Sequence, residues 1–257
     1  MGGDGPRFGT PSEGYAERSK RPLASLVLLV PFILAYEFAS ISLLRSGEPG
    51  PELRAERLLA LLFDTFGLPG VALPVLAIVV VLLVHHATLG HRWSVKPGTI
   101  GVMALESLAW TLPLLVLGQL VVRLLGGVPL AAAGLIDPAV LPLGVREGLT
   151  IGIGAGLFEE LIFRMALIAL LHFALHDVCL VPQRHAGWLT IVLSSAAFAW
   201  YHDPWTAGGL DFAAAGFFFI AGVGFAVLYL WRGFGIAAAT HSLYDILVLL
   251  VLPALRG

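Results

Sequence analysis

Long apolar runs alternate with short polar segments along this chain of 257 residues. A helix that crosses a lipid bilayer needs about 20 predominantly apolar residues. Because a spanning helix satisfies its backbone hydrogen bonds internally, runs of this length predict an all-α, polytopic membrane helical bundle of seven to eight transmembrane helices. The seven clear runs are 22–44, 68–89, 101–125, 148–175, 187–202, 212–231 and 234–254.

Three other segments do not fit this simple pattern. Residues 51–67 place leucine and phenylalanine at helical spacing among charged residues, which is typical of an amphipathic helix at the membrane interface. Residues 127–145 are apolar but contain three prolines, so they could form a re-entrant segment or an eighth, irregular crossing. Residues 1–21 are polar, and we expect a disordered tail there, followed by an uncleaved membrane anchor.

The composition agrees with a membrane protein. Hydrophobic residues make up 58% of the chain and charged residues only 12%, and the mean hydropathy is +0.90. A soluble domain carries about a quarter charged residues, so lipid contact replaces the missing polar surface. The net charge of −2 gives no indication of a nucleic-acid partner. The single cysteine, Cys179, cannot form an internal disulfide.

Charged residues inside the apolar stretch "GLFEELIFRMAL", residues 156–167, need a physical explanation. An ionised glutamate or arginine at the centre of a spanning helix costs about 2.5–3.5 kcal/mol. Glu160 and Arg164 stand four residues apart on one helix face, so they can neutralise each other as an ion pair. Glu159 is rotated about 100° away from that face and needs a partner from another helix.

Two later apolar runs supply candidate partners. "AFAWYHD" places Phe198 and His202 four residues apart, and "ATHSLYD" places His241 and Asp245 at the same spacing. A lone histidine near a helix end is usually a satisfied polar group. Polar groups in a lipid-embedded bundle converge, however, because each needs a partner. Glu159 and the two histidines could therefore surround one water molecule, which a glutamate can activate as a general base.

Other polar and aromatic residues have simpler interpretations. Glu106 lies within the third apolar run, where we expect it to bind a partner in the bundle or to line the same cavity. Trp200, Tyr201 and Trp205 are typical of the aromatic belt at a membrane surface.

Taken in order, "EELIFR", "FAWYH" and "HSLYD" resemble the EExxxR, FxxxH and HxxxN/D motifs of the CPBP family. These intramembrane glutamic endopeptidases include the type II CAAX prenyl proteases and bacteriocin-processing enzymes. The resemblance covers about residues 146–252 and implies hydrolysis of a peptide bond in a membrane-associated or lipidated substrate, with no cofactor and no metal. It divides the chain into a polar tail (1–21), N-terminal transmembrane helices with interfacial segments (22–145) and a catalytic helical core (146–254).

The resemblance also implies roles for the motif residues. Glu159 would be the general base that activates a water, and His202 would orient that water. His241 and Asp245 would stabilise the oxyanion of the tetrahedral intermediate. The supporting residues, which would brace the first motif or pack beside the site, are Glu160, Arg164 and Phe198.

Asp245 departs from the eukaryotic CAAX proteases, which carry asparagine at this position. An asparagine can donate a hydrogen bond to an oxyanion, whereas an ionised aspartate repels it. Asp245 is therefore expected either to be protonated or, as we prefer, to orient the His241 ring and favour its imidazolium form.

The basic residues do not fix the topology. The cluster Arg18, Lys20 and Arg21 favours a cytoplasmic N-terminus, but with seven or eight spans eight basic residues lie on one side and six on the other. In the CAAX proteases the cavity is reached from the cytosol, which here requires an even number of crossings before residue 148. This requirement favours 127–145 as a crossing. We expect a multi-pass integral protein of the cell (inner) membrane whose substrate is a peptide or protein, prenylated or not.

Two other function classes stay open. Glu159, His202 and His241 could form the two-histidine, one-carboxylate site of a metal-dependent hydrolase, which chelators would inhibit. The chain could also be a non-catalytic membrane protein, such as an immunity factor, scaffold or transporter, that has kept the motifs. Full biological activity of a Glu159→Ala variant would favour that last class.

Overall fold

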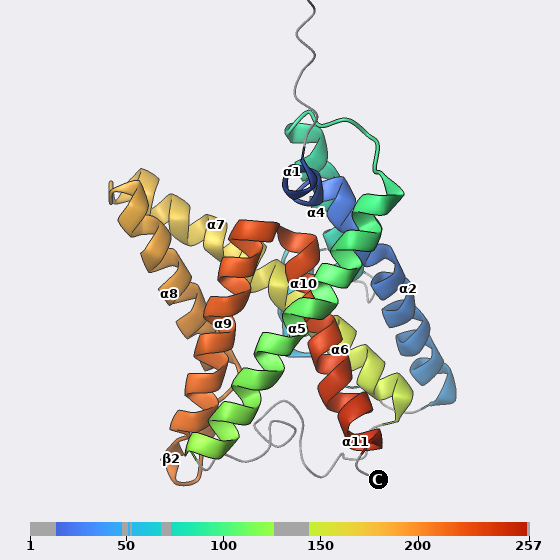
Figure 1. Cartoon of the computed structure of the whole chain (residues 1–257), viewed down its shortest axis with the longest axis vertical. Coiled ribbons are helices and arrows are strands. Elements are labelled where there is room, and N and C mark those ends of the chain that lie inside the picture. The colour runs from blue at the N-terminus through green and yellow to red at the C-terminus, as the bar shows by residue number, and fades with distance from the viewer. Residues whose placement is uncertain (1–13, 48–50, 52, 68–72, 126–143, 256–257) are drawn as a thin grey trace, which may run out of the picture.

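The computed structural model describes residues 14–47, 51, 53–67, 73–125 and 144–255, and within them the chain is almost entirely helical (Figure 1). A two-residue strand pair, β1 (Trp205–Thr206) and β2 (Gly209–Leu210), is the exception. The predicted all-α membrane fold is confirmed. The helices that pass through the bundle are α2 (Pro22–Ser46), α4 (Leu73–Thr88), α5 (Pro97–Leu125), α6 (Val145–Glu159), α8 (Gln183–Tyr201), α9 (Phe212–Arg232) and α10 (Phe234–Ile246).

Two of these helices continue without a break into π-helical and further α-helical turns. α6 runs on through η2 (Glu160–Ala166), α7 (Leu167–His172) and η3 (Phe173–Val178), and α10 runs on through η4 (Leu247–Val251) and α11 (Leu252–Ala254). Among the described residues, five helices are long and apolar enough to cross a membrane. They are Pro22–Ser46, Pro97–Val121, Val145–Val178, Phe212–Arg232 and Phe234–Ala254.

The other two predicted spans, 68–89 and 187–202, contain helices that are not both long and apolar enough to count as membrane-crossing helices. The apolar helix within the first is shorter, Pro74–Thr88. The second forms α8, which has 19 residues but begins with Gln183, Arg184 and His185. A polar first turn of this kind lowers the mean hydropathy of a helix without preventing it from packing in the bundle.

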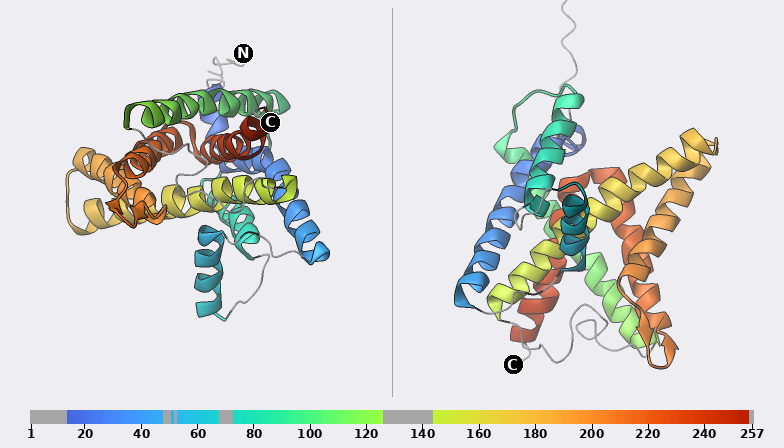
Figure 2. Two further views of the ribbon diagram at one scale, coloured as in Figure 1. Left: turned by 90° about the horizontal axis from the view of Figure 1, so that it is seen from below. Right: turned by 180° about the vertical axis from the view of Figure 1, so that it is seen from behind.

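Helix α10 lies at the centre of the bundle, in contact with α2, α5, α6 and α9 (Figures 1 and 2). Its first half contains Ala237, Ala238 and Ala239, all buried, and small side chains let neighbouring backbones approach closely. Gly156 of α6 marks the closest approach, because a Cβ at this position would overlap with Ser242 of α10. This crossing brings the EExxxR and HxxxD motifs side by side.

The polar tail is partly ordered, contrary to the prediction for residues 1–21. Tyr15–Ser19 form a short helix, α1, and residues 1–13 lie outside the described part of the chain. α1 is held because Tyr15 donates a hydrogen bond to Glu106 of α5, and Arg232 of α9 donates one to Ser19. Long-range partners of this kind cannot be recognised in a short polar sequence.

The amphipathic segment predicted at 51–67 contains the helix α3 (Arg54–Thr65) on the outside of the bundle (Figure 2). Ala55 and Leu59 are buried against the core. The side chains on its other face are about half exposed, as expected for a helix that rests on lipid. These are Leu58, Leu61 and Leu62.

The number of crossings before α6 depends on the ends of the bundle at which α1 and α6 begin. Figure 1 shows α1 at one end of the bundle and the start of α6, together with the C-terminus, at the other. Three described helices, α2, α4 and α5, pass between them, which is an odd number. The end of α5 and the start of α6 lie at the same end. Residues 126–143, which include nearly all of the proposed eighth crossing, lie outside the described residues.

Candidate active site

The first motif lies where α6 changes into a π-helix. Glu159 is the last residue of α6 and Glu160 is the first of η2. Single π-turns within α-helices occur frequently at functional sites. The Nε of Arg164 lies 3.2 Å from Oε2 of Glu160, and both side chains are almost completely buried. The predicted ion pair is therefore present.

Glu160 has a second partner that the sequence analysis missed. Nδ1 of His241 lies 2.9 Å from Oε1 of Glu160, so the imidazole donates a hydrogen bond to the carboxylate. The two residues are 81 positions apart, on η2 and α10. One carboxylate thus links the arginine of the first motif to the histidine of the third.

The carboxylate of Glu159 faces both histidines. Its Oε2 lies 3.6 Å from Nε2 of His202 and 3.8 Å from Nε2 of His241. These separations exceed those of good direct hydrogen bonds. Among the described residues, this oxygen has no hydrogen-bond partner although it is buried. A bridging water satisfies buried polar atoms at such spacings, and the predicted convergence of Glu159, His202 and His241 is seen in the geometry.

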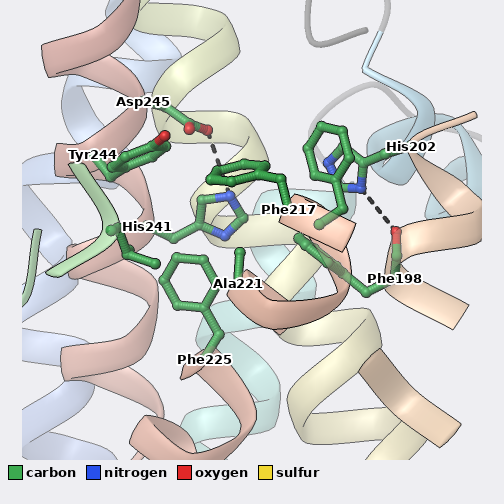
Figure 3. Close-up of a pocket in the computed structure, with 10 residues that line it drawn as sticks. Phe198, His202, Phe217, Ala221, Phe225, His241, Tyr244 and Asp245 are labelled. Atoms are coloured by element: carbon green, nitrogen blue, oxygen red, sulfur yellow. Dashed lines mark hydrogen bonds and ion pairs between the residues drawn. The ribbon is translucent and has the colours of Figure 1, made fainter. Parts of the chain in front are cut away.

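The ring of His202 is fixed by its own helix and by an aromatic neighbour. Its Nδ1 lies 2.8 Å from the carbonyl oxygen of Phe198, one turn earlier (Figure 3). The ring stacks on Phe218 at 4.0 Å between centroids and 17° between planes. Because the carbonyl can only accept, Nδ1 carries the proton, and in the neutral ring Nε2 presents a lone pair toward Glu159.

The third motif adds a further acid to the same cluster. Oδ2 of Asp245 lies 3.5 Å from Nε2 of His241 (Figure 3), and the imidazole stacks on Phe225 at 4.5 Å and 20°. Glu160 therefore faces one ring nitrogen of His241, and Asp245 and Glu159 face the other. This arrangement orients the ring and surrounds it with acceptors and negative charge.

Aromatic faces hold the guanidinium of Arg164. Its Cζ lies 4.2 Å above the ring of Phe198 and 5.5 Å from that of Phe225. Cation–π contacts of this kind gain strength when water is excluded. Phe198 thus supports the site in two ways, because its ring carries Arg164 and its carbonyl accepts from His202.

A small cavity of about 20 Å³ adjoins the two imidazoles. A cavity needs roughly 10–15 Å³ to hold one water molecule, so there is room for a single water. Glu159 does not line this cavity but faces the ring nitrogens beside it. The residues that line it are Leu114, Phe198, His202, Phe217, Phe218, Ala221, Phe225, His241, Tyr244 and Asp245.

One aromatic residue was misplaced by the sequence analysis. Trp200 and Trp205 are 68% and 50% exposed, in keeping with an aromatic belt. Tyr201 instead turns inward, with its ring 5.1 Å from the rings of both Phe163 and His202. The sequence contained a signal for this inward position. Tyr201 follows Phe198 by three residues, and residues i and i+3 share a helix face.

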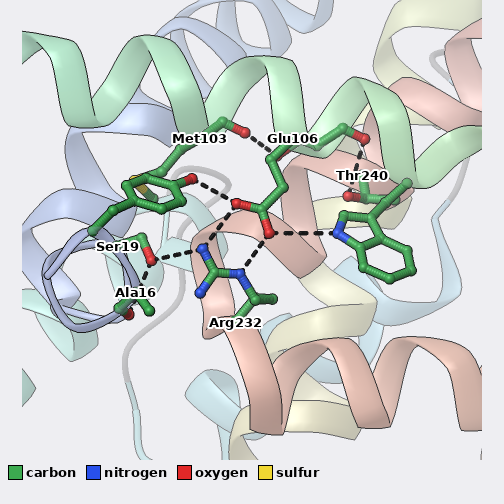
Figure 4. A network of polar contacts seen from close by, with 9 residues as sticks. Ala16, Ser19, Met103, Glu106, Arg232 and Thr240 are labelled. Carbon is green, nitrogen blue, oxygen red and sulfur yellow. Dashed lines mark hydrogen bonds and ion pairs between the residues drawn. The ribbon is translucent and has the colours of Figure 1, made fainter.

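Glu106 belongs to a separate polar network and not to the cavity. It accepts hydrogen bonds from Arg232 and Tyr15, with Arg232 Nη2 2.8 Å from its Oε2, and Trp110 approaches its other oxygen (Figure 4). Burial and the neighbouring carboxylate raise the pKa of Tyr15 to about 12, so this phenol remains a donor at neutral pH. The network fastens α1 to α5 and α9.

These features define a polytopic helical membrane protein with a buried acid–imidazole cluster on three neighbouring helices. Residues 142–247 match the family model described as "Rce1-like: Type II CAAX prenyl endopeptidase Rce1-like". All seven motif residues fall within this range. Over these residues the chain is similar to the CAAX-type intramembrane proteases, and its long apolar helices are those of an integral membrane protein. No curated protein and no solved structure matches the chain.

Proposed function

We propose that this protein is a glutamic intramembrane endopeptidase in which Glu159 activates the attacking water. The observation that carries the proposal is the position of Glu159 Oε2, 3.6 Å from His202 Nε2 and 3.8 Å from His241 Nε2. This oxygen is buried and has no hydrogen-bond partner among the described residues. A carboxylate in that setting can accept a proton from a water held between it and the imidazoles.

The geometry supports a division of roles between the two histidines. A water that donates one hydrogen to Glu159 and the other to the lone pair on His202 Nε2 presents its oxygen toward a peptide carbonyl. Attack forms the new C–O bond while Glu159 takes the proton. Collapse of the tetrahedral intermediate breaks the C–N bond, and the proton passes from Glu159 to the leaving amine. No covalent acyl-enzyme is required.

His241 is suited to stabilise the oxyanion. Its Nδ1 is occupied by Glu160, which leaves Nε2–H of the imidazolium to donate to the developing negative charge. Asp245, one turn away, orients the ring and stabilises its positive charge, which is the role we prefer for this residue. Glu160, Arg164 and Phe198 hold the first two motifs in register.

The proposed substrate is a membrane-associated peptide or protein. The motif helices lie within a bundle that displays many exposed apolar side chains, which supports a membrane-associated substrate. A prenylated C-terminal tail, a peptide leader or the terminus of a membrane protein would meet this requirement. We place the protein in the cell (inner) membrane, with the core 146–254 as the catalytic part and 1–21 and 22–145 as tail and supporting helices.

The test is cleavage of membrane-anchored peptides by the purified protein in lipid nanodiscs. Wild type is compared with Glu159→Gln, His202→Ala and His241→Ala, and with Glu147→Gln as a control from the first turn of α6. Loss of cleavage in the first three variants, with the control unchanged, supports the proposal. Equal cleavage by all variants refutes it. Inhibition by EDTA, with recovery when zinc or iron is added, would favour the metal-dependent hydrolase. Full biological activity of the Glu159→Gln variant would favour the non-catalytic membrane protein.

A further inference from the structure

Helix α9 contributes no residue to the three motifs, yet it contacts both imidazoles of the candidate site. Phe218 stacks on His202 at 4.0 Å between ring centroids and 17° between planes. Phe225 stacks on His241 at 4.5 Å and 20° (Figure 3). Both phenylalanines are only 3% exposed. A helix outside the motifs therefore presents a flat aromatic face to each histidine.

The spacing of the two phenylalanines places them on one side of α9. Phe218 and Phe225 are seven residues apart, which is close to two turns of an α-helix. Ala221 lies between them, is also buried and lines the same small cavity. A phenylalanine moved by one position would be rotated by about 100° and would lose its histidine. The seven-residue spacing lets a single helix face serve rings that come from α8 and α10.

The position of α9 is fixed relative to both of these helices. A Cβ on Gly222 would lie 3.1 Å from Cα and Cβ of Ser195, so α9 packs closely on α8 between the two phenylalanines. At the other end, Gly233 alone separates α9 from α10, and its φ of +90° forms a tight turn. The stacking faces are therefore held against the elements that carry the two histidines.

A stacked ring supplies a restraint that the hydrogen bonds of the histidines lack. Nδ1 of His202 lies 2.8 Å from the carbonyl oxygen of Phe198, and Nδ1 of His241 lies 2.9 Å from Glu160. One hydrogen bond fixes an edge of the ring but lets the ring turn about that bond. A phenyl face in van der Waals contact blocks this rotation. Both Nε2 atoms are then kept on the side of Glu159, 3.6 and 3.8 Å from its Oε2.

We propose that Phe218 and Phe225 are positioning residues that hold Nε2 of His202 and of His241 toward Glu159. The inference rests on the proposed function, in which His202 is neutral and His241 is an imidazolium. A phenyl face attracts a cation, and the attraction is stronger where water is excluded. Phe225 therefore holds a charged ring by electrostatic attraction as well as by contact, whereas Phe218 acts by stacking alone. Neither phenylalanine touches the reacting atoms.

The first test is Phe218→Leu and Phe225→Leu, with the membrane-anchored peptide that wild type cleaves in nanodiscs. Leucine keeps an apolar side chain but removes the flat face. We expect kcat to fall roughly tenfold in each variant, since a small misorientation of a catalytic group is costly, and KM to stay unchanged. Phe219→Leu is the control, because Phe219 is a half-buried phenylalanine of α9 that does not line the cavity.

The outcomes of this test are distinct. Wild-type kcat in either leucine variant overturns the role of that phenylalanine. A raised KM with unchanged kcat also overturns it, in favour of contact with the substrate. An equal loss of kcat in Phe219→Leu would show that any cavity in α9 impairs the enzyme, and would overturn both roles.

A second test keeps the shape of the ring and changes only its charge distribution. Ring-fluorinated phenylalanine is placed at position 218 or at position 225, where it fills nearly the same space but has a less negative face. We expect kcat to fall severalfold with the substitution at Phe225 and to stay at the wild-type value with the substitution at Phe218. Wild-type kcat for the fluorinated Phe225 protein, or an equal loss at both positions, overturns the electrostatic role of Phe225.

Glu159→Gln separates this inference from the proposed function. If Glu159→Gln cleaves as wild type does, the proposed function fails. If Glu159→Gln is inactive while Phe218→Leu and Phe225→Leu are fully active, only the positioning role of α9 fails.

Discussion

Nδ1 of His241 lies 2.9 Å from Oε1 of Glu160, while Nε of Arg164 lies 3.2 Å from the other oxygen of the same carboxylate. The second glutamate of the first motif is therefore shared between two cations or potential cations. Buried charge is stabilised only when it is paired and hydrogen-bonded. Glu160 pairs with Arg164 within its own helix and with His241 of α10. This double pairing gives the second acid of the motif a structural task beside the candidate base.

Glu160→Gln should destabilise the fold as well as stop cleavage. The substitution keeps the size of the side chain but leaves Arg164 buried without its carboxylate, and breaking a buried ion pair costs roughly 3–5 kcal/mol. We expect a clearly lower thermal unfolding midpoint in detergent and no measurable cleavage. Glu147→Gln, in the partly exposed first turn of α6, should change neither. A Glu160→Gln protein with the wild-type midpoint would show that Arg164 does not depend on this pair.

Gly156→Ala should separate the two helices that carry Glu159 and His241. A Cβ at this position would overlap with the side chain and backbone of Ser242, so α6 and α10 must move apart. Overpacking of this kind costs about 1–3 kcal/mol, and the site should lose most of its activity because the carboxylate of Glu159 and the imidazole of His241 move apart. Unfolding midpoint and kcat are the two measurements.

The matched control for that substitution is Gly224→Ala. Gly224 lies within α9, and a Cβ there would meet no atom within 4 Å. Alanine is favoured over glycine in a helix interior by about 1 kcal/mol, so this variant should be as stable as wild type or slightly more so. If both variants behave alike, the α6–α10 contact does not limit the position of Glu159.

The sequence was most informative where a local rule applied. Apolar runs predicted the helices, and the i,i+4 spacing predicted the contact of Glu160 with Arg164. The contacts of Glu160 with His241 and of Glu106 with Arg232 join residues 81 and 126 positions apart. The pairing of a buried acid with a distant base depends on how the helices cross. Hydrophobic periodicity does not encode the crossing of helices.

The same limit applies to the N-terminal segment and to the end of the bundle at which α6 begins. Residues 1–21 resemble a free tail by composition, but Tyr15–Ser19 are ordered by partners on α5 and α9. The count of basic residues is eight to six with either seven or eight spans, so charge could not decide whether α6 starts at the same end of the bundle as α1. It starts at the opposite end (Figure 1).

Glu106→Gln should release α1 from the bundle. The carboxylate accepts from both Tyr15 and Arg232, and the amide can neither neutralise the arginine nor accept from both donors equally well. We expect faster trypsin cleavage after Lys20, followed by mass spectrometry, with little direct effect on the peptide-cleaving site. Glu17→Gln, an exposed substitution within α1, is the control. Equal cleavage rates for wild type and Glu106→Gln would mean that α1 is held by apolar contacts alone.

Asp245→Asn distinguishes the two roles considered for the third motif. If Asp245 stabilises a positively charged His241 across the 3.5 Å between Oδ2 and Nε2, the amide removes that charge while preserving size. Glu160 still holds the other ring nitrogen, so the loss should be partial, with kcat about tenfold lower and KM unchanged. Asp245→Leu removes polarity altogether and should cost considerably more. If instead position 245 donates directly to the oxyanion, asparagine is the better donor and kcat should equal or exceed that of wild type. A comparison of kcat for the three proteins in nanodiscs therefore assigns Asp245 either to ring orientation or to the oxyanion itself.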